Sequence, residues 1–178
     1  MQDIEAVIRW VETNATKTAT GLAIPNPANI AAFDHPLSEG LRELYRLADG
    51  ASAFGPDDEF LGTVLPYAYL YSLADSDAEW HNARDAQDVV TRAGFLVNDP
   101  FHAEYVPFAG LDGNFYFVDM RAGEQQGSVG WWDGVEGAEM SRWTNVEHMF
   151  GELLVALESG TAFENATPMV SAGVVDWT

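Results

Sequence analysis

Carboxylates are the side chains whose types and spacing in this sequence could do chemistry. Asp112, Asp119 and Asp133 flank a strongly apolar run at 115–118, and Glu124 stands in the loop between the last two. Carboxylates that converge can divide acid and base work, or bind a hard cation such as Ca²⁺. Asp112 and Asp133 each precede glycine, however, where aspartate commonly caps a turn. The sequence therefore favours turn residues and keeps a carboxylate-based metal-binding protein or hydrolase as an alternative.

No other catalytic pattern is present. The chain has no cysteine, and its four histidines are scattered without an HExxH pair. It also lacks a GxSxG elbow, a P-loop and a dinucleotide-binding fingerprint. The acidic triplet at 57–59 is typical of a solvated loop rather than of a metal site. We therefore expect no enzyme activity, no catalytic residue, no cofactor and no metal.

The charge balance is extreme for a chain of 178 residues. Eight basic side chains face 28 acidic ones, which gives a net charge of −20. Such a field repels nucleic acid and anionic membranes and attracts basic protein partners. Lys17 is the only lysine, and this bias is equally typical of a GC-rich genome or a salt-adapted proteome. Charge alone does not separate these two interpretations.

The composition predicts one cytoplasmic domain over residues 1–178. Apolar residues make up 47% of the chain, as in a globular protein. The N-terminus lacks the basic region and hydrophobic run of a signal peptide. No apolar stretch approaches the roughly 20 residues that span a bilayer. The sequence leaves the oligomeric state open.

The elements that must position the carboxylates form an antiparallel meander over 105–134. The run 115–118 is aromatic and β-branched and apolar on both parities, which predicts a central strand covered on both faces. A strand at 105–108 precedes it and one at 128–132 follows it. Pro107 cannot donate to a ladder, so the first strand should lie at an edge or carry a bulge there.

Helical periodicity surrounds this meander. The spacing of apolar residues predicts helices over 4–12, 37–48, 75–90 and 146–157. Thr144 and Glu147 have the spacing of a capping box, and Gly160 should end the last helix. Residues 14–29 should form a long connection with room for one short turn of helix. Residues 139–143 should add a strand, and the end of the chain should add an edge strand or a short helix. The prediction is an α+β fold with a central, mostly antiparallel sheet flanked by helices.

Several segments in this order resemble the SUKH superfamily, which includes the fungal cell-wall assembly regulators. The resemblance covers roughly residues 34–160 and departs at 14–29 and in the tail. It is carried by segments that share their order and spacing with the family: LRELY at 41–45, DG at 49–50, Trp80, YVPFA at 105–109, DGN at 112–114 with Asp119, GSVG at 127–130, and the helix at 146–157.

The resemblance implies a SUKH-like fold and a binding protein. Many bacterial members look like immunity proteins that neutralise a toxin, and fungal members look like regulatory scaffolds. Our first hypothesis is an immunity protein that binds a basic, nuclease-type protein toxin without chemistry. An intracellular regulator of the cell-wall assembly type is the alternative from another class.

The candidate partner-binding surface centres on two adjacent tryptophans. Trp131 and Trp132 should point to opposite faces of their strand, one of them into the core. The sequence favours burial of both. If one is exposed, we expect it beside Asp133 and the Glu124 loop, where an aromatic contact and steering carboxylates would suit a basic partner. The predicted partner-binding set is Trp131, Trp132, Asp133, Glu124 and Asp112.

Overall fold

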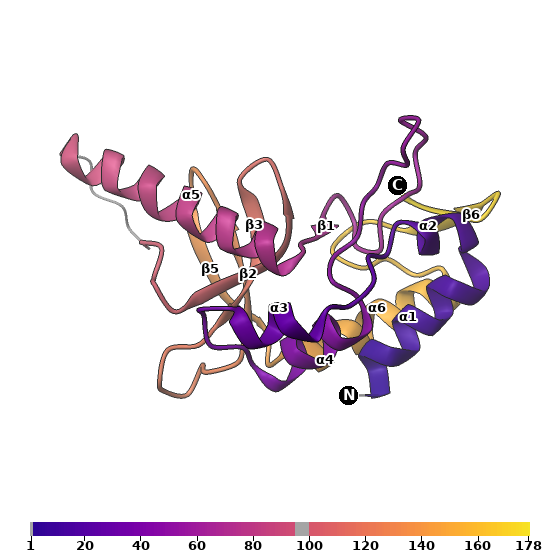
Figure 1. Ribbon diagram of the computed structural model, residues 1–178, viewed down its shortest axis with the longest axis horizontal. Coiled ribbons are helices and arrows are strands. Elements are labelled where there is room, and N and C mark those ends of the chain that lie inside the picture. Colours follow the sequence, from indigo (N-terminus) through magenta and orange to yellow (C-terminus); the bar gives the residue numbers. More distant parts are fainter. Residues whose placement is uncertain (1, 95–99) are drawn as a thin grey trace.

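The computed structural model describes residues 2–94 and 100–178 as an α+β fold (Figure 1). A five-stranded antiparallel sheet has the order β1-β2-β3-β4-β5, and β6 and β7 form a separate hairpin. The helices are α1 (Gln2–Asn14), α2 (Thr16–Thr20), α3 (Pro27–Ala32), α4 (Glu39–Leu47), α5 (Leu73–Arg92) and α6 (Val146–Ser159). The strands are β1 (Tyr69–Leu70), β2 (Tyr105–Leu111), β3 (Asn114–Asp119), β4 (Val129–Asp133), β5 (Gly137–Trp143), β6 (Pro168–Ser171) and β7 (Val174–Trp177).

The sheet separates two apolar cores, and strand alternation sends successive residues of β3 into each. Tyr116 and Val118 enter the larger core, which also takes apolar residues from α1, α4 and α6. Phe115 and Phe117 enter a smaller aromatic core beneath α5. The prediction of a central strand covered on both faces is therefore confirmed.

Pro107 shows how the sequence shapes the sheet. The β2–β3 register shifts between Pro107 and Ala109, so the predicted bulge is confirmed. On its other side β2 pairs with β1 only at Ala109 and Gly110, and no ladder partner needs the amide that Pro107 lacks.

The prediction that Thr144 caps the last helix is wrong. Asn145, not Thr144, precedes α6, and its side-chain oxygen accepts the His148 amide at 2.7 Å. Asparagine caps a helix about as well as serine or threonine, so the adjacent residue can take the position. Gly160 does end α6, with φ of 68°. A capping box is present instead at α5, between Ser72 and Asp75.

The remaining elements differ modestly from expectation. The predicted connection at 14–29 contains the short helix α2 and the start of α3. Ser38 caps α4, which therefore begins after the predicted start at Leu37. The end of the chain, predicted as an edge strand or a short helix, forms the separate β6–β7 hairpin.

Asp49, of the DG pair after α4, fixes the position of α5. Its buried carboxylate accepts the Leu73 amide at 3.0 Å and the Asn29 side-chain amide at 2.8 Å. Asp49→Ala would leave a buried amide without a partner, and we expect it to destabilise the protein by about 2–3 kcal/mol. Urea unfolding of this variant beside Asp57→Ala, which alters an exposed loop carboxylate, measures the difference. Equal stability of the two variants would contradict this role.

Candidate functional site

Two sheet turns bring Asp112 and Asp133 to the same end of the sheet. Asp112 and Gly113 have φ of 54° and 80° and form the two-residue turn between β2 and β3. Asp133 begins the turn between β4 and β5. The Asn114 side chain accepts the Gly134 amide at 3.0 Å and joins the two turns. The backbone thus holds both carboxylates in place.

A groove opens between these turns and one side of α5. Its volume is about 440 Å³, and we call it the acidic groove. It is lined by Glu79, Asn82, Ala83, Ala86, Gln87 and Val90 of α5 and by Asp112, Gly113, Trp132, Asp133, Gly134, Val135, Glu136 and Gly137 of the sheet.

Carboxylates surround the acidic groove without basic neighbours in its lining. Glu79, Asp112, Asp133 and Glu136 contribute negative charge, and none of the described lining residues is lysine, arginine or histidine. The backbone amides of Glu136 and Val135 donate to the Asp133 carboxylate and lower its pKa, so it stays charged well below neutral pH. With no basic residue among the described lining residues, this negative charge would attract a cation or a basic side chain.

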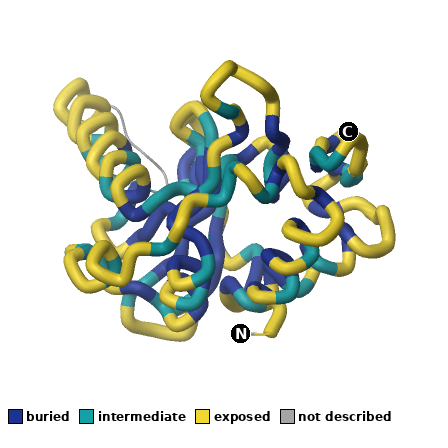
Figure 2. Tube along the Cα trace, turned by 45° about the vertical axis from the view of Figure 1, so that its right-hand side comes forward, coloured by how far each residue is buried: buried dark blue, intermediate teal, exposed yellow. Residues whose placement is uncertain are grey.

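Apolar surface complements that charge. Val135 is 95% exposed at the tip of the β4–β5 turn, and Val90 is 38% exposed on α5. The outer turns of α5 project beyond the sheet with mostly exposed residues (Figure 2). Exposed apolar residues edged by charges are typical of protein-binding surfaces. The acidic groove therefore suits an amphipathic, basic segment of another protein.

Burial makes the charged form of the Glu79 carboxyl unfavourable, and keeping a carboxyl there despite this cost supports a binding role. Burial raises the pKa of the Glu79 carboxyl, while a hydrogen bond with Asn82 opposes the shift. The folded protein therefore holds this proton more tightly than the unfolded chain does, and stability is lost as pH rises through the raised pKa. Carboxylates retained despite such a cost cluster at functional sites.

We expect Glu79→Gln to raise the melting temperature at pH 7. The gain should fade as pH falls below the ordinary carboxyl pKa of 4.5, where wild-type Glu79 is also neutral. Thermal unfolding of both proteins between pH 4 and pH 8 tests this. A gain independent of pH, or a loss at pH 7, would contradict the assigned cost.

The structure separates the predicted partner-binding residues. Asp112, Trp132 and Asp133 line the acidic groove, but Trp132 is only 7% exposed. Trp131 lies on the opposite face, half-buried beside Tyr116 at 4.6 Å between ring centroids. The Arg142 guanidinium lies 5.6 Å from the centre of the Trp131 ring. The structure therefore places no fully exposed tryptophan beside Asp133.

Glu124 and Asp119 lie at the other end of the sheet from Asp112 and Asp133. The expectation that Glu124 stands beside Asp133 is wrong, because β4 runs between them. Asp119 is buried and forms a two-pronged ion pair with Arg121, with a closest contact of 2.7 Å. The four carboxylates therefore form no common site. Within residues 2–94 and 100–178, no group of three or more acidic, histidine or cysteine side chains is arranged to hold a metal ion.

Sequence reasoning missed the side of the groove that α5 contributes. Glu79, Ala83, Ala86 and Val90 recur at helical spacing and share one face of α5. This spacing is a signal that the sequence does carry. The acidic turn residue Glu136 and the exposed Val135 carry no such signal before the turn is placed.

Fold and groove together define an α+β domain with an antiparallel meander between two apolar cores and an acidic groove at one end of its sheet. The SMI1 / KNR4 family (SUKH-1) matches residues 30–154, well over half of the chain, and the protein belongs to this family. A search of curated proteins gave no match. None of the helices in the described part of the chain is long and apolar enough to cross a membrane.

The matched range is shorter than the chain at both ends. It contains the five-stranded sheet, the second half of α3, all of α4 and α5, and most of α6. The helices α1 and α2 and the β6–β7 hairpin lie outside it, although α1 packs on α6 and β7 contributes to the larger core. These outer elements lie outside the matched range and pack into the same core as the matched part.

Proposed function

We propose that this protein is a cytoplasmic immunity protein that binds a basic, nuclease-type protein toxin and blocks it without chemistry. Membership of the SUKH-1 family is consistent with an immunity role and with a cell-wall regulator role. The observation that carries the immunity role is the acidic groove, where four carboxylates meet exposed apolar residues and none of the described lining residues is basic. A partner that presents lysine or arginine beside apolar side chains complements it.

The charge of the whole chain supports the same proposal. The net charge of −20 would steer a basic protein toward the surface from beyond contact distance. The groove then concentrates that attraction on one concave surface. A charge that reflected only a GC-rich genome or a salt-adapted proteome would not need such a surface. Tight, fast binding is what neutralising a toxin demands.

Co-expression with the product of the adjacent reading frame is the direct test. We expect that product to arrest growth when expressed alone, and growth to recover when both proteins are present. Size-exclusion chromatography of the mixture should show a stoichiometric complex. Continued killing with both proteins soluble would contradict the proposal.

The regulator role makes a different prediction in the same system. It expects no complex with the neighbouring product, and reproducible capture of housekeeping proteins from native lysate. An acidic-groove variant described in the Discussion provides the control, because specific capture should weaken when the groove loses its charge. Capture that does not change with that variant would show that the groove is not the binding surface.

A further inference from the structure

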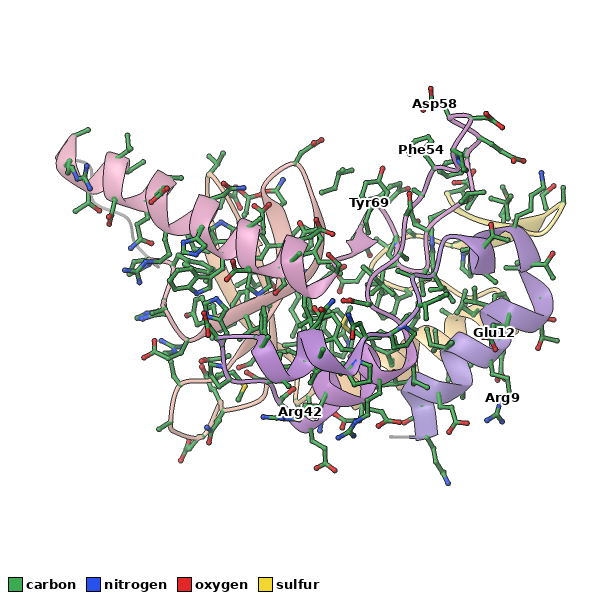
Figure 3. The ribbon with its side chains drawn as sticks, viewed as in Figure 1. Arg9, Glu12, Arg42, Phe54, Asp58 and Tyr69 are labelled. Atoms are coloured by element: carbon green, nitrogen blue, oxygen red, sulfur yellow. The ribbon has the colours of Figure 1, made fainter. Side chains whose placement is uncertain are left out.

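A second exposed surface lies on a loop that projects beside β1. Phe54 and Phe60 pair as an isolated antiparallel bridge, and their ring centroids lie 5.7 Å apart. They are 50% and 42% exposed. Figure 3 shows Phe54 and Asp58 on this loop, away from the body of the protein. Two large aromatic rings are thus held at the surface with about half of each side chain exposed.

The 54–60 loop has a defined conformation. The Gly55 amide donates to the Glu59 carbonyl at 2.8 Å, and the Asp58 amide donates to the Gly55 carbonyl. The Ser52 hydroxyl donates to the Phe54 carbonyl and accepts the Phe54 amide. A loop already ordered in the free protein loses little conformational entropy when it binds.

Both ends of this loop are held by parts of the chain outside the family match. The Ser52 amide donates to the Gly21 carbonyl at 2.9 Å at the first end. At the second end the Thr18 hydroxyl donates to the Leu61 carbonyl at 2.6 Å and accepts the Val175 amide at 2.9 Å. The chain around α2 and β7, absent from residues 30–154, therefore positions the loop.

Close packing at Gly62 reinforces this arrangement. Gly62 has φ of 85° and forms a parallel bridge with Val175. A Cβ atom at Gly62 would lie 2.2 Å from the Val175 carbonyl oxygen, so only glycine fits. The Trp177 indole donates to the Thr63 carbonyl at 3.1 Å from the same strand. Elements outside the matched range thus converge on one exposed loop.

The tip of the loop is acidic. Asp57, Asp58 and Glu59 lie between the two phenylalanines, and Lys17 forms an ion pair of 2.6 Å with Glu59. A second copy of this chain would bring like charges together, given the net charge of −20. The complementary partner has an apolar cleft edged by lysine or arginine side chains.

This surface adjoins the acidic groove. A cavity of about 580 Å³ lies between the base of the loop and the first turns of α5, and Phe54, Tyr69 and Glu79 are among its lining residues. Glu79 lines both hollows. One partner could therefore contact the loop and the groove together.

We propose that the 54–60 loop is a second contact element that inserts its Phe54–Phe60 pair into an apolar cleft of the basic partner. This inference rests on the proposed function and adds an aromatic contact outside the acidic groove. The groove steers the partner, and the aromatic pair slows its release.

The test measures binding of the purified product of the adjacent reading frame by surface plasmon resonance. The double variant Phe54→Ser/Phe60→Ser is compared with Met169→Ser/Val170→Ser, whose residues are 49% and 46% exposed on β6. We expect the loop variant to dissociate about 30-fold faster, as for the loss of an interface hot spot, and the β6 variant to behave as wild type. Both variants should remain folded at the measurement temperature, and the melting temperature of each should fall only modestly because the changed side chains are about half exposed.

The outcomes separate this inference from the proposed function. Unchanged dissociation of the loop variant, with weakened binding by the groove variant, overturns the second contact and leaves the proposed function standing. Absence of any wild-type complex overturns both. A photoreactive phenylalanine analogue at Asp58 gives a further readout, because it should cross-link to the product in the wild-type background. No cross-link, with a complex present, also overturns the inference.

Discussion

Removing the four carboxylates of the acidic groove should slow partner association about 10- to 100-fold at low ionic strength, while the fold stays intact. The variant Glu79→Gln, Asp112→Asn, Asp133→Asn, Glu136→Gln preserves shape. Asparagine before Gly113 suits the left-handed turn, and at position 133 its side-chain oxygen can still accept the two turn amides. The variant therefore removes charge from a surface whose geometry is retained.

A matched control separates the groove from the overall charge. Glu12, Glu104, Glu124 and Glu158 are exposed and line no part of the groove. Their conversion to glutamine takes the net charge from −20 to −16, the same change as in the groove variant. We expect this control to associate within about threefold of wild type near 0.15 M salt, because charges beyond the Debye length of about 8 Å are then largely screened.

Stopped-flow or surface plasmon resonance measurements between 20 and 500 mM salt check this prediction. Wild-type association should fall steeply with salt, and that of the groove variant should fall much less. Equal slowing of the two variants would show that total charge, not the groove, steers the partner. The test uses Glu124 as a control because the structure places it away from Asp133.

The sheet could be predicted from sequence because its signals are local. Aromatic and β-branched residues at 115–118 identified a central strand, and Pro107 marked the bulge. The antiparallel meander itself also determines which turns share an end of the sheet. The separation of Asp119 and Glu124 from Asp112 and Asp133 could therefore have been predicted by following strand direction from one turn to the next.

The other side of the groove could not be placed by local signals. Nothing near Glu79 in sequence specifies that α5 packs beside the β4–β5 turn; this follows from aromatic packing across the smaller core. The same holds for the loop at 54–60, whose position depends on Thr18 and Val175. Contacts between residues far apart in the sequence decide both surfaces.

The adjacent tryptophans give the second prediction, because they occupy different cores. Trp132 packs against Phe101 at 5.4 Å between ring centroids and belongs to the aromatic cluster beneath α5. Trp131 is half-buried on the other face, beside Arg142. We expect Trp132→Ala to cost about 3–5 kcal/mol of unfolding free energy. Trp131→Ala should cost about 1–2 kcal/mol, since less apolar area leaves contact.

The functional consequence should differ as well. Trp132 forms part of the groove floor and packs in the core beneath α5, so Trp132→Ala should weaken partner binding even below its melting temperature. Native-state hydrogen exchange should show α5 amides losing protection more than those of α6. Trp132→Phe should recover much of both properties by refilling the core. A larger loss of unfolding free energy from Trp131→Ala than from Trp132→Ala would contradict this prediction. Unchanged hydrogen-exchange protection of the α5 amides in Trp132→Ala would also contradict it, because the smaller core would then not position α5 beside the groove.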